Sequence, residues 1–212
     1  MYVSPSIMSA HLESLGRDIA ECEKAGVFSF HLDVMDGHFA PNISMGPDFY
    51  GMLKRITNVP VESHLMLERP DSYYDRFTDH DRDTVLIHYE SPIDVLGLLK
   101  RMKGENVRYG IAINPETPFE KVADLISEAD ILLIMSVHPG FSGQKFIDVS
   151  DKIRNASEYI RREDLKTKIE VDGGINGETA KKIRESGADI AVSASYIFGG
   201  IIGERIRALS LI

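Results

Sequence analysis

The sequence predicts a single (β/α)8 barrel, the TIM-barrel fold, that takes up residues 1–212 as one domain. Short apolar runs alternate with longer amphipathic segments along the whole chain, and the alternation repeats eight times without an intervening linker or low-complexity tract. Such a pattern is typical of βαβ units and a parallel sheet. Eight units favour closure into a barrel, and an open doubly wound sheet is the alternative.

The predicted strands are the short apolar runs. In chain order they cover residues 2–8, 28–35, 60–67, 84–88, 107–113, 130–137, 168–172 and 189–194. A barrel of this type usually has about 250 residues. The 212 residues here therefore leave room only for short loops.

The predicted helices fill the intervals between strands. They cover residues 12–25, 46–57, 70–78, 92–103, 118–126, 148–162, 176–186 and 203–210. Pro118 stands in the first turn of its helix, where the missing N–H costs nothing, and Gly187 follows the seventh helix as a C-terminal glycine.

Composition excludes several classes of function. The formal net charge of −9 argues against a nucleic-acid or anionic membrane surface, since both need clustered cations. Cys22 is the only cysteine, so no intrachain disulfide can form, and a cytoplasmic location is expected. No apolar run reaches the roughly 20 residues of a membrane span. The expected partner is a small molecule.

Polar residues gather where the predicted strands end. His31 and Asp33 are two residues apart in one strand and share a face, while His64 and Asp172 belong to two other strands. Two imidazoles and two carboxylates at one rim suit a single divalent cation such as zinc, manganese, iron or cobalt. The alternative is that His31 and Asp33 form only a local hydrogen-bonded pair.

The remaining histidines are weaker candidates. His80 lies in the polar stretch "TDHDRD" and is expected on the surface. The others are His11, His38, His88 and His138.

Three glycine-rich segments follow the last three strands. They read "HPGFSGQKF" (138–146), "VDGGIN" (171–176) and "SASYIFGG" (193–200), with Lys145 as their only cation. Barrels of this type commonly bind phosphate after strands 7 and 8, where glycine lets backbone amides approach the anion. The alternative is that these glycines only form tight turns.

Methionines form the third feature of the same rim. Met35, Met66 and Met135 stand near the ends of three strands, where their sulfurs would make an apolar, polarizable floor. Core filling is the alternative reading of these residues.

With these residues assembled, the chain resembles the ribulose-phosphate 3-epimerase family along essentially its whole length. The matching stretches are "SPSIMSAHLESL", "HLDVMDGHFAPN", "SHLMLERP", "INPETP", "MSVHPGFSGQKF", "IEVDGGI" and "YIFGG". The resemblance implies a metal-dependent isomerase of the pentose phosphate pathway, with a homo-oligomeric state. It would interconvert D-ribulose 5-phosphate and D-xylulose 5-phosphate by two-base proton transfer at C3 through an enediolate.

The resemblance also assigns roles. His31, Asp33, His64 and Asp172 correspond to the metal ligands, and Asp33 and Asp172 to the acid–base pair. The substrate-binding positions are Ser6, Met35, His64, Met66, Met135, Gly140, Phe141, Ser142, Gly143, Gly173, Gly174, Ala194 and Ser195. Residues 37–42 and 139–145 are the candidates for a loop that closes over substrate.

The chain departs from the family at the phosphate end. Ala194 replaces a usual glycine, and its methyl would narrow the approach and disfavour positive φ. His138 and Ser142 replace an acidic residue and a glycine of many relatives. Met8 is also found in a similar branch that epimerises D-allulose 6-phosphate, which keeps that substrate as an alternative. The double glycine of "VDGGI" favours the pentulose.

Two other classes of function are possible. Lyases on similar barrels use an Asp-x-Lys-x-x-Asp array, but Met35 stands where the lysine would be. A Schiff-base aldolase would need a lysine at the inner rim, and Lys168 begins its strand at the opposite end. A non-enzymatic sugar-phosphate binder is the other alternative, although all four ligand residues and both carboxylates are present.

Overall fold

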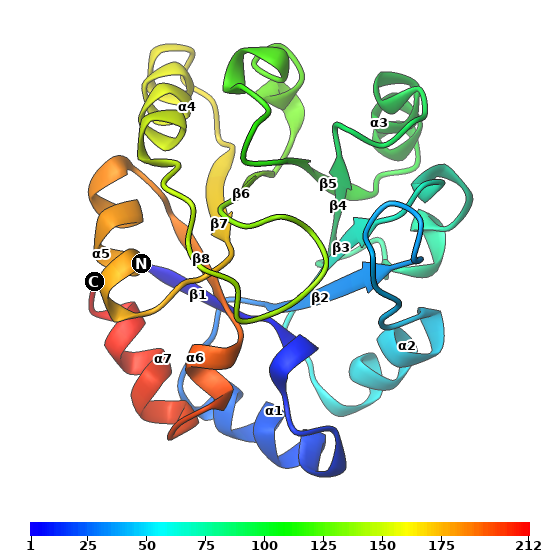
Figure 1. The fold of residues 1–212 in the computed structure, drawn as a ribbon. Coiled ribbons are helices and arrows are strands. Elements are labelled where there is room, and N and C mark those ends of the chain that lie inside the picture. The colour runs from blue at the N-terminus through cyan, green and yellow to red at the C-terminus, as the bar shows by residue number, and fades with distance from the viewer.

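Eight parallel strands form the wall of a barrel in the computed structural model, which describes residues 1–212 (Figure 1). The strands are β1 (Tyr2–Pro5), β2 (Phe30–Met35), β3 (Val61–Met66), β4 (Thr84–His88), β5 (Arg108–Ile113), β6 (Ile131–Met135), β7 (Lys168–Asp172) and β8 (Ile190–Ser193). They pair in the order β1-β8-β7-β6-β5-β4-β3-β2. A parallel bridge between Ser6 and His31 joins the two ends of this order. The barrel prediction is confirmed, and the open-sheet alternative is wrong.

Helices surround the barrel, as Figure 1 shows. They are α1 (Leu15–Lys24), α2 (Pro47–Ile56), α3 (Val95–Gly104), α4 (Ser150–Arg162), α5 (Gly177–Ser186), α6 (Ser195–Phe198) and α7 (Ile202–Ser210). In α5, the side chains of Asn176 and Thr179 cap each other's backbone N–H groups. Gly187 ends this helix with a left-handed φ of 111°, as its position predicts.

Two predicted helices are wrong. Residues 70–78 form two short 3-10 turns, Pro70–Ser72 and Tyr74–Arg76, and residues 118–126 also form no α-helix. The second segment contains the 3-10 turn Phe119–Lys121, and its last residue begins another, Ile126–Glu128. Both predicted segments have only nine residues and contain aromatic or β-branched side chains, which favour helices weakly. Their buried residues pack against the barrel without a regular helix.

The apolar core has two main parts. The larger lies between the strands and the surrounding helices. The smaller part comes mainly from alternate residues of β4, β5, β6 and β8 and includes Leu86, Ala112, Leu133 and Ile190. Its members come from the strands themselves, because side chains of a barrel strand alternate between interior and exterior. The strands β2, β3 and β7 instead carry polar residues at buried positions.

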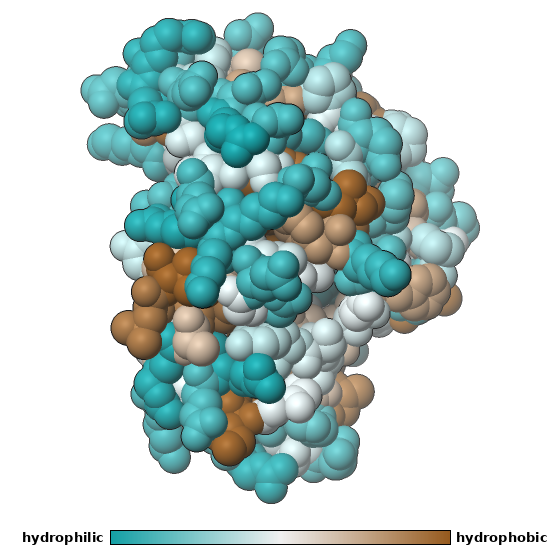
Figure 2. Space-filling view, turned by 60° about the vertical axis from the view of Figure 1, so that its left-hand side comes forward, coloured by the Kyte–Doolittle hydropathy of each residue, from teal (hydrophilic) through white to brown (hydrophobic).

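The face of the molecule in Figure 2 is mainly hydrophilic, and the hydrophobic residues on that face form small separate patches. None of the helices has both the length and the apolar character that crossing a membrane requires. The two chain ends lie close together in Figure 1, where the Met1 amino group donates a hydrogen bond to the Ser210 carbonyl oxygen.

Candidate functional site

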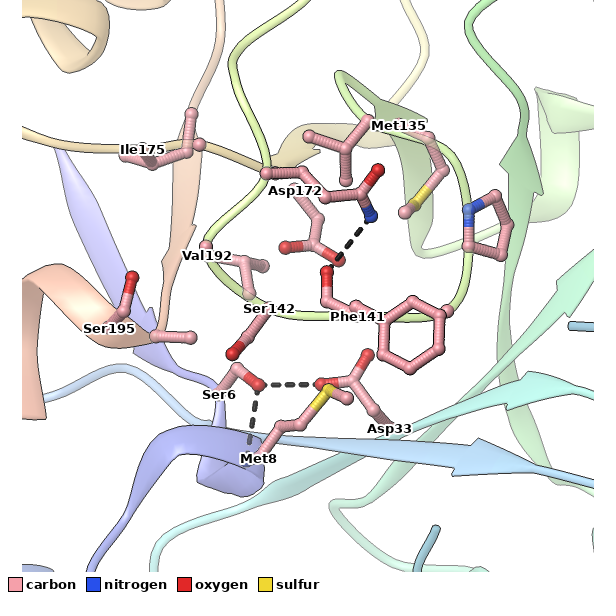
Figure 3. Close-up of a pocket in the computed structure, with 18 of the residues that line it drawn as sticks. Ser6, Met8, Asp33, Met135, Phe141, Ser142, Asp172, Ile175, Val192 and Ser195 are labelled. Carbon is pink, nitrogen blue, oxygen red and sulfur yellow. Dashed lines mark hydrogen bonds between the residues drawn. The ribbon is translucent and has the colours of Figure 1, made fainter. Parts of the chain in front are cut away.

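A cavity of about 320 Å³ lies at the C-terminal ends of the strands. Figure 3 shows residues of its lining, which come from several different strands and the loops that follow them. Fourteen predicted site residues line it: Ser6, Asp33, Met35, Met66, Met135, Gly140, Phe141, Ser142, Gly143, Asp172, Gly173, Gly174, Ala194 and Ser195. His31 and His64 are fully buried and adjoin Asp33.

The four predicted ligand residues converge. His31 Nε2 lies 3.2 Å from His64 Nδ1, and Asp33 Oδ1 lies 3.6 Å and 3.4 Å from these two nitrogens. Asp172 Oδ2 completes the group at 3.9 Å from His31 Nε2. One ligand atom from each residue lies within 4.8 Å of every other. Two nitrogen and two carboxylate donors that face one another fit a divalent transition-metal ion.

The two aspartates lie in different environments. Asp33 Oδ2 accepts a hydrogen bond of 2.6 Å from Ser6 Oγ, which Figure 3 shows. Although burial opposes ionisation of Asp33, the adjoining His31 and His64 lower its pKa below the usual range. Burial and then the charge of Asp33 raise the pKa of Asp172 to about 7, partly offset by His31. The pair therefore has one anchored carboxylate and one that can hold a proton near neutral pH.

Two acidic residues that adjoin the Nδ1 atom of His31 were not singled out from the sequence. Glu62 Oε2 and Glu170 Oε1 lie 3.8 Å and 3.7 Å from His31 Nδ1, and both side chains are buried. Burial and then the charge of Glu62 raise the pKa of Glu170 well above its usual value. Strand alternation carried a signal for both, because Glu62 shares a face with His64 and Glu170 with Asp172.

A further histidine and acid adjoin His64 on its other side. His88, the last residue of β4, lies with its Nε2 atom 2.8 Å from His64 Nε2. Its Nδ1 atom is 3.0 Å from Glu90 Oε2. The sequence placed His88 only among the weaker candidates. The spacing of His88 and Glu90 repeats that of His31 and Asp33 at another strand end, and this repetition was the available signal.

The other weaker histidines lie outside the group of four candidate metal ligands. His11 binds Asp18, His38 contacts the backbone of Asp36, and His80 is exposed as predicted. His138 lines the cavity, and its Nε2 atom is 2.6 Å from Glu116 Oε1. The cavity is also lined by nine residues that were not among the predicted site residues: Met8, Val137, His138, Pro139, Gln144, Ile175, Asn176, Val192 and Tyr196.

Glycine is required by the backbone in the loop after β7. Gly173 and Gly174 have φ values of 119° and 63°. A Cβ atom at Gly173 would lie 2.5 Å from Val137, and one at Gly174 would lie 2.7 Å from the backbone nitrogen of Phe146. Tight packing of the two loops thus explains these glycines without a ligand, and it also brings both loops to the cavity wall. Ala194 has a φ of −110°, which alanine adopts readily, so the expectation that alanine would disfavour the backbone conformation at this position is wrong.

The loop after β6 crosses the mouth of the barrel, as Figures 1 and 3 show. Ser142 Oγ is 3.1 Å from Ser9 Oγ on the opposite side of the mouth. The Asn42 side-chain amide donates a 2.8 Å hydrogen bond to the Gly140 carbonyl oxygen. This bond joins the two loops, 37–42 and 139–145, that the sequence predicts as candidates for closing over substrate.

Comparison with solved structures supports the barrel fold alone. A 3-hexulose-6-phosphate synthase from Salmonella typhimurium is similar over 100% of this chain and 97% of its own, with 15% identity and a TM-score of 0.70. The tryptophan synthase α-subunit from Pyrococcus furiosus reaches the same TM-score at 10% identity, over 100% of this chain and 97% of its own. Such low identities leave the chemistry open.

Sequence comparison is more specific. The model of the ribulose-phosphate 3 epimerase family matches residues 2–198. The ribulose-phosphate 3-epimerase of Bacillus subtilis (strain 168) is 40% identical over 213 residues, which cover 98% of this chain and 96% of that protein. The enzyme of the same name from Methanocaldococcus jannaschii is 42% identical over 93% of this chain and 84% of its own. With this identity over nearly its full length, the chain belongs to the ribulose-phosphate 3-epimerase family.

Proposed function

We propose that the protein interconverts D-ribulose 5-phosphate and D-xylulose 5-phosphate by inverting the configuration at C3. The observation that carries this proposal is the placement of Asp33 and Asp172 on different strands at one cavity, beside two buried histidines. Inversion needs one group that removes a proton from one face of the sugar and another that delivers a proton to the opposite face. A single base tends to return the proton to its original face.

His31, Asp33, His64 and Asp172 would hold a divalent cation, for which zinc, manganese, iron and cobalt are the candidates. When bound, such a cation supplies Lewis-acid stabilisation of the negative charge that develops at the C2 oxygen of the sugar. The C3 proton is acidic because the C2 carbonyl accepts this charge in an enediolate. The chain's own carboxylates then carry the proton transfers.

Asp172 is suited to exchange a proton with C3. Burial and the charge of Asp33 raise its pKa to about 7 in the metal-free site, and a bound divalent cation would lower it again, which would leave Asp172 available as a base near neutral pH. Asp33 is held by Ser6 and lies against both histidines, so its position is fixed on a different strand, and we assign it the proton transfer at the other face of the sugar. Removal of a proton by one aspartate and return by the other leaves the pair in exchanged protonation states after each turnover.

The other lining residues would hold the substrate. Met35, Met66 and Met135 offer an apolar floor beside the planar intermediate, and all three are buried. The loops with Gly140, Gly173 and Ser195 would bind the phosphate through backbone amides, which suits a site with few cations. The remaining substrate-binding positions proposed from the sequence are Ser6, His64, Phe141, Ser142, Gly143, Gly174 and Ala194. The loop 139–145, already linked to Asn42, is our candidate for the lid.

D-Allulose 6-phosphate is the alternative substrate. It is suggested by Met8, which lines the cavity, and by the departures from the family at His138, Ser142 and Ala194. Our proposal also includes the cytoplasmic location and the homo-oligomeric state expected from the resemblance. The lyase alternative receives no specific support, because Met35 stands in the cavity where a lyase of the similar type would have lysine. The binder alternative receives none either, because all four ligand residues and both carboxylates are present.

Proton NMR in D2O tests the proposal. Metal-loaded protein is incubated with D-ribulose 5-phosphate, and the C3 proton signal is followed together with the appearance of xylulose 5-phosphate. Loss of the C3 signal with growth of deuterated xylulose 5-phosphate is the expected result. Absence of exchange, with metal confirmed in the protein, would reject the pentulose substrate. The same experiment with D-allulose 6-phosphate would then test the alternative.

A further inference from the structure

A buried hydrogen-bonded chain leads away from the candidate metal cluster through His64. The imidazoles of His64 and His88 are both fully buried, with their Nε2 atoms 2.8 Å apart. His88 Nδ1 lies 3.0 Å from Glu90 Oε2. The opposite nitrogen of His64, Nδ1, faces the metal cluster, at 3.4 Å from Asp33 Oδ1. One imidazole therefore contacts the cluster on one edge and a second imidazole on the other.

The hydrogen-bonded chain from His64 ends at Glu90, and the position of Glu90 is fixed. Glu90 Oε1 accepts a 2.8 Å hydrogen bond from the backbone N–H of Asn114 and another from the hydroxyl of Thr117. Although burial opposes ionisation, the contacts with His88 and Thr117 lower the pKa of Glu90. An ionised carboxylate can only accept hydrogen bonds. The second oxygen of Glu90 is thus left to accept one from His88.

The acceptor at Glu90 sets the direction of every bond in the chain. His88 Nδ1 must carry a hydrogen to donate to Glu90, which leaves Nε2 of a neutral His88 as an acceptor. Only one hydrogen fits between the two Nε2 atoms, so His64 Nε2 donates it. His64 Nδ1 then has no hydrogen and presents its lone pair to the cluster, as a metal ligand must.

Packing holds the same geometry. The rings of His64 and His88 lie edge to edge and nearly coplanar, with an interplanar angle of 21° and a centroid separation of 4.9 Å, as the contact between their Nε2 atoms requires. The ring of Phe39 packs on His88 with a centroid separation of 4.7 Å. Turning either imidazole over would place ring carbons at these contacts and break the hydrogen bonds, and Phe39 restrains the plane of the His88 ring.

We infer that His88 and Glu90 are positioning residues that fix His64 in the tautomer with Nδ1 free to bind a divalent cation. This inference rests on the metal site in the proposed function. The role differs from that of a ligand, because neither residue belongs to the group of four ligand atoms. The inference predicts that breaking the hydrogen bonds from His64 through His88 to Glu90 weakens metal binding even in the absence of sugar.

Metal affinity without substrate tests the inference. Zinc, cobalt, manganese and iron dissociation constants are measured by competition with a chromophoric chelator for the wild type, His88→Phe and His88→Gln. Phenylalanine keeps an aromatic ring but offers no acceptor, so the dissociation constant should rise by about 10- to 100-fold. Glutamine can accept through its amide oxygen, so His88→Gln should retain more affinity than His88→Phe. Should His88→Phe fail to fold, Glu90→Leu carries the same expectation.

The matched control is His11→Phe. His11 forms a histidine–carboxylate pair with Asp18 at 2.8 Å, but it lies outside the metal cluster. Its substitution should leave the zinc dissociation constant unchanged. A second readout is ¹⁵N NMR of the histidine rings in the metal-free wild type, where His64 should carry its hydrogen on Nε2.

The outcomes separate the two proposals. Wild-type protein that binds none of the four candidate cations would overturn the metal site and this inference with it. Normal wild-type affinity with unchanged affinity in folded His88→Phe would overturn the positioning role alone. A hydrogen found on Nδ1 of His64 in the metal-free wild type would overturn it equally.

Discussion

Replacing Asp172 with asparagine tests the two-base scheme most directly. The exchange preserves the shape of the side chain but removes its ability to take a proton. The Asp172 side chain is 16% exposed, and its Oδ2 atom lies 3.9 Å from His31 Nε2. The side chain therefore has space for an amide without a new clash, so the fold should be retained and the effect should fall on chemistry.

The expected loss is large. A positioned general base contributes about 10²- to 10⁴-fold to rate, which corresponds to roughly 3–5 kcal/mol of activation free energy. Asp172 is also a proposed ligand, and an amide binds a transition-metal ion more weakly than a carboxylate does. Turnover in Asp172→Asn should therefore fall by at least about 100-fold even when the metal is present in excess.

Deuterium exchange separates the two carboxylates. Each epimer is incubated separately with Asp172→Asn in D2O, and both loss of the C3 proton and formation of the other epimer are measured. One epimer should still lose its C3 proton slowly through Asp33, while inversion is lost from both. Asp164→Asn is the matched control, because Asp164 is exposed in the loop before β7, at the opposite end of that strand. Near-wild-type inversion in metal-loaded Asp172→Asn would refute the two-base reasoning.

Three further outcomes follow from the structure. Ala194→Gly should lower the KM for D-ribulose 5-phosphate by about threefold, or roughly 0.7 kcal/mol, because it removes a methyl group from the cavity wall; an unchanged KM would mean that the methyl does not crowd the phosphate. Asp83→Ala should lower the free energy of unfolding in urea by about 3 kcal/mol, because fully buried Asp83 accepts hydrogen bonds from a tyrosine hydroxyl, Lys54 and a backbone amide. Exposed Asp151→Ala is its control, and equal effects of the two would contradict the argument. Burial and nearby acidic residues raise the pKa of Cys22 from 9.0 to about 12. Above pH 9 the unfolded chain therefore loses the thiol proton while the folded chain keeps it. The free energy of unfolding should then fall more steeply with pH in the wild type than in Cys22→Ala, by about 1.4 kcal/mol per pH unit. Parallel pH profiles would show that the thiol is not protected.

The barrel could be predicted because its pattern is local. Each strand needs only a short apolar run, and each crossover needs a segment with one apolar face, so the order of elements is readable along the chain. The segments 70–78 and 118–126 show where this reasoning fails. Both have apolar positions that pack on the barrel, but whether such a short segment forms an α-helix or separate 3-10 turns depends on its contacts with neighbouring elements.

The candidate ligands could be predicted for a related reason. His31, Asp33, His64 and Asp172 are polar residues in apolar strands, and the C-terminal ends of parallel strands meet at one rim. Their distances from one another could not be predicted, because those depend on the register of the barrel. That register pairs Asp33 with His64 and Met135 with Asp172 across neighbouring strands.

The fold class, the family and the identity of the candidate ligands could all be read along the chain. The residues that contact those ligands from behind became evident only in the folded barrel. Glu62 and Glu170 come from strands that are not neighbours, yet both lie near the Nδ1 atom of His31. His88 and Glu90 lie on the far edge of His64. These contacts join residues that are far apart in the sequence. They form because closing the barrel turns alternate side chains of separate strands toward one interior.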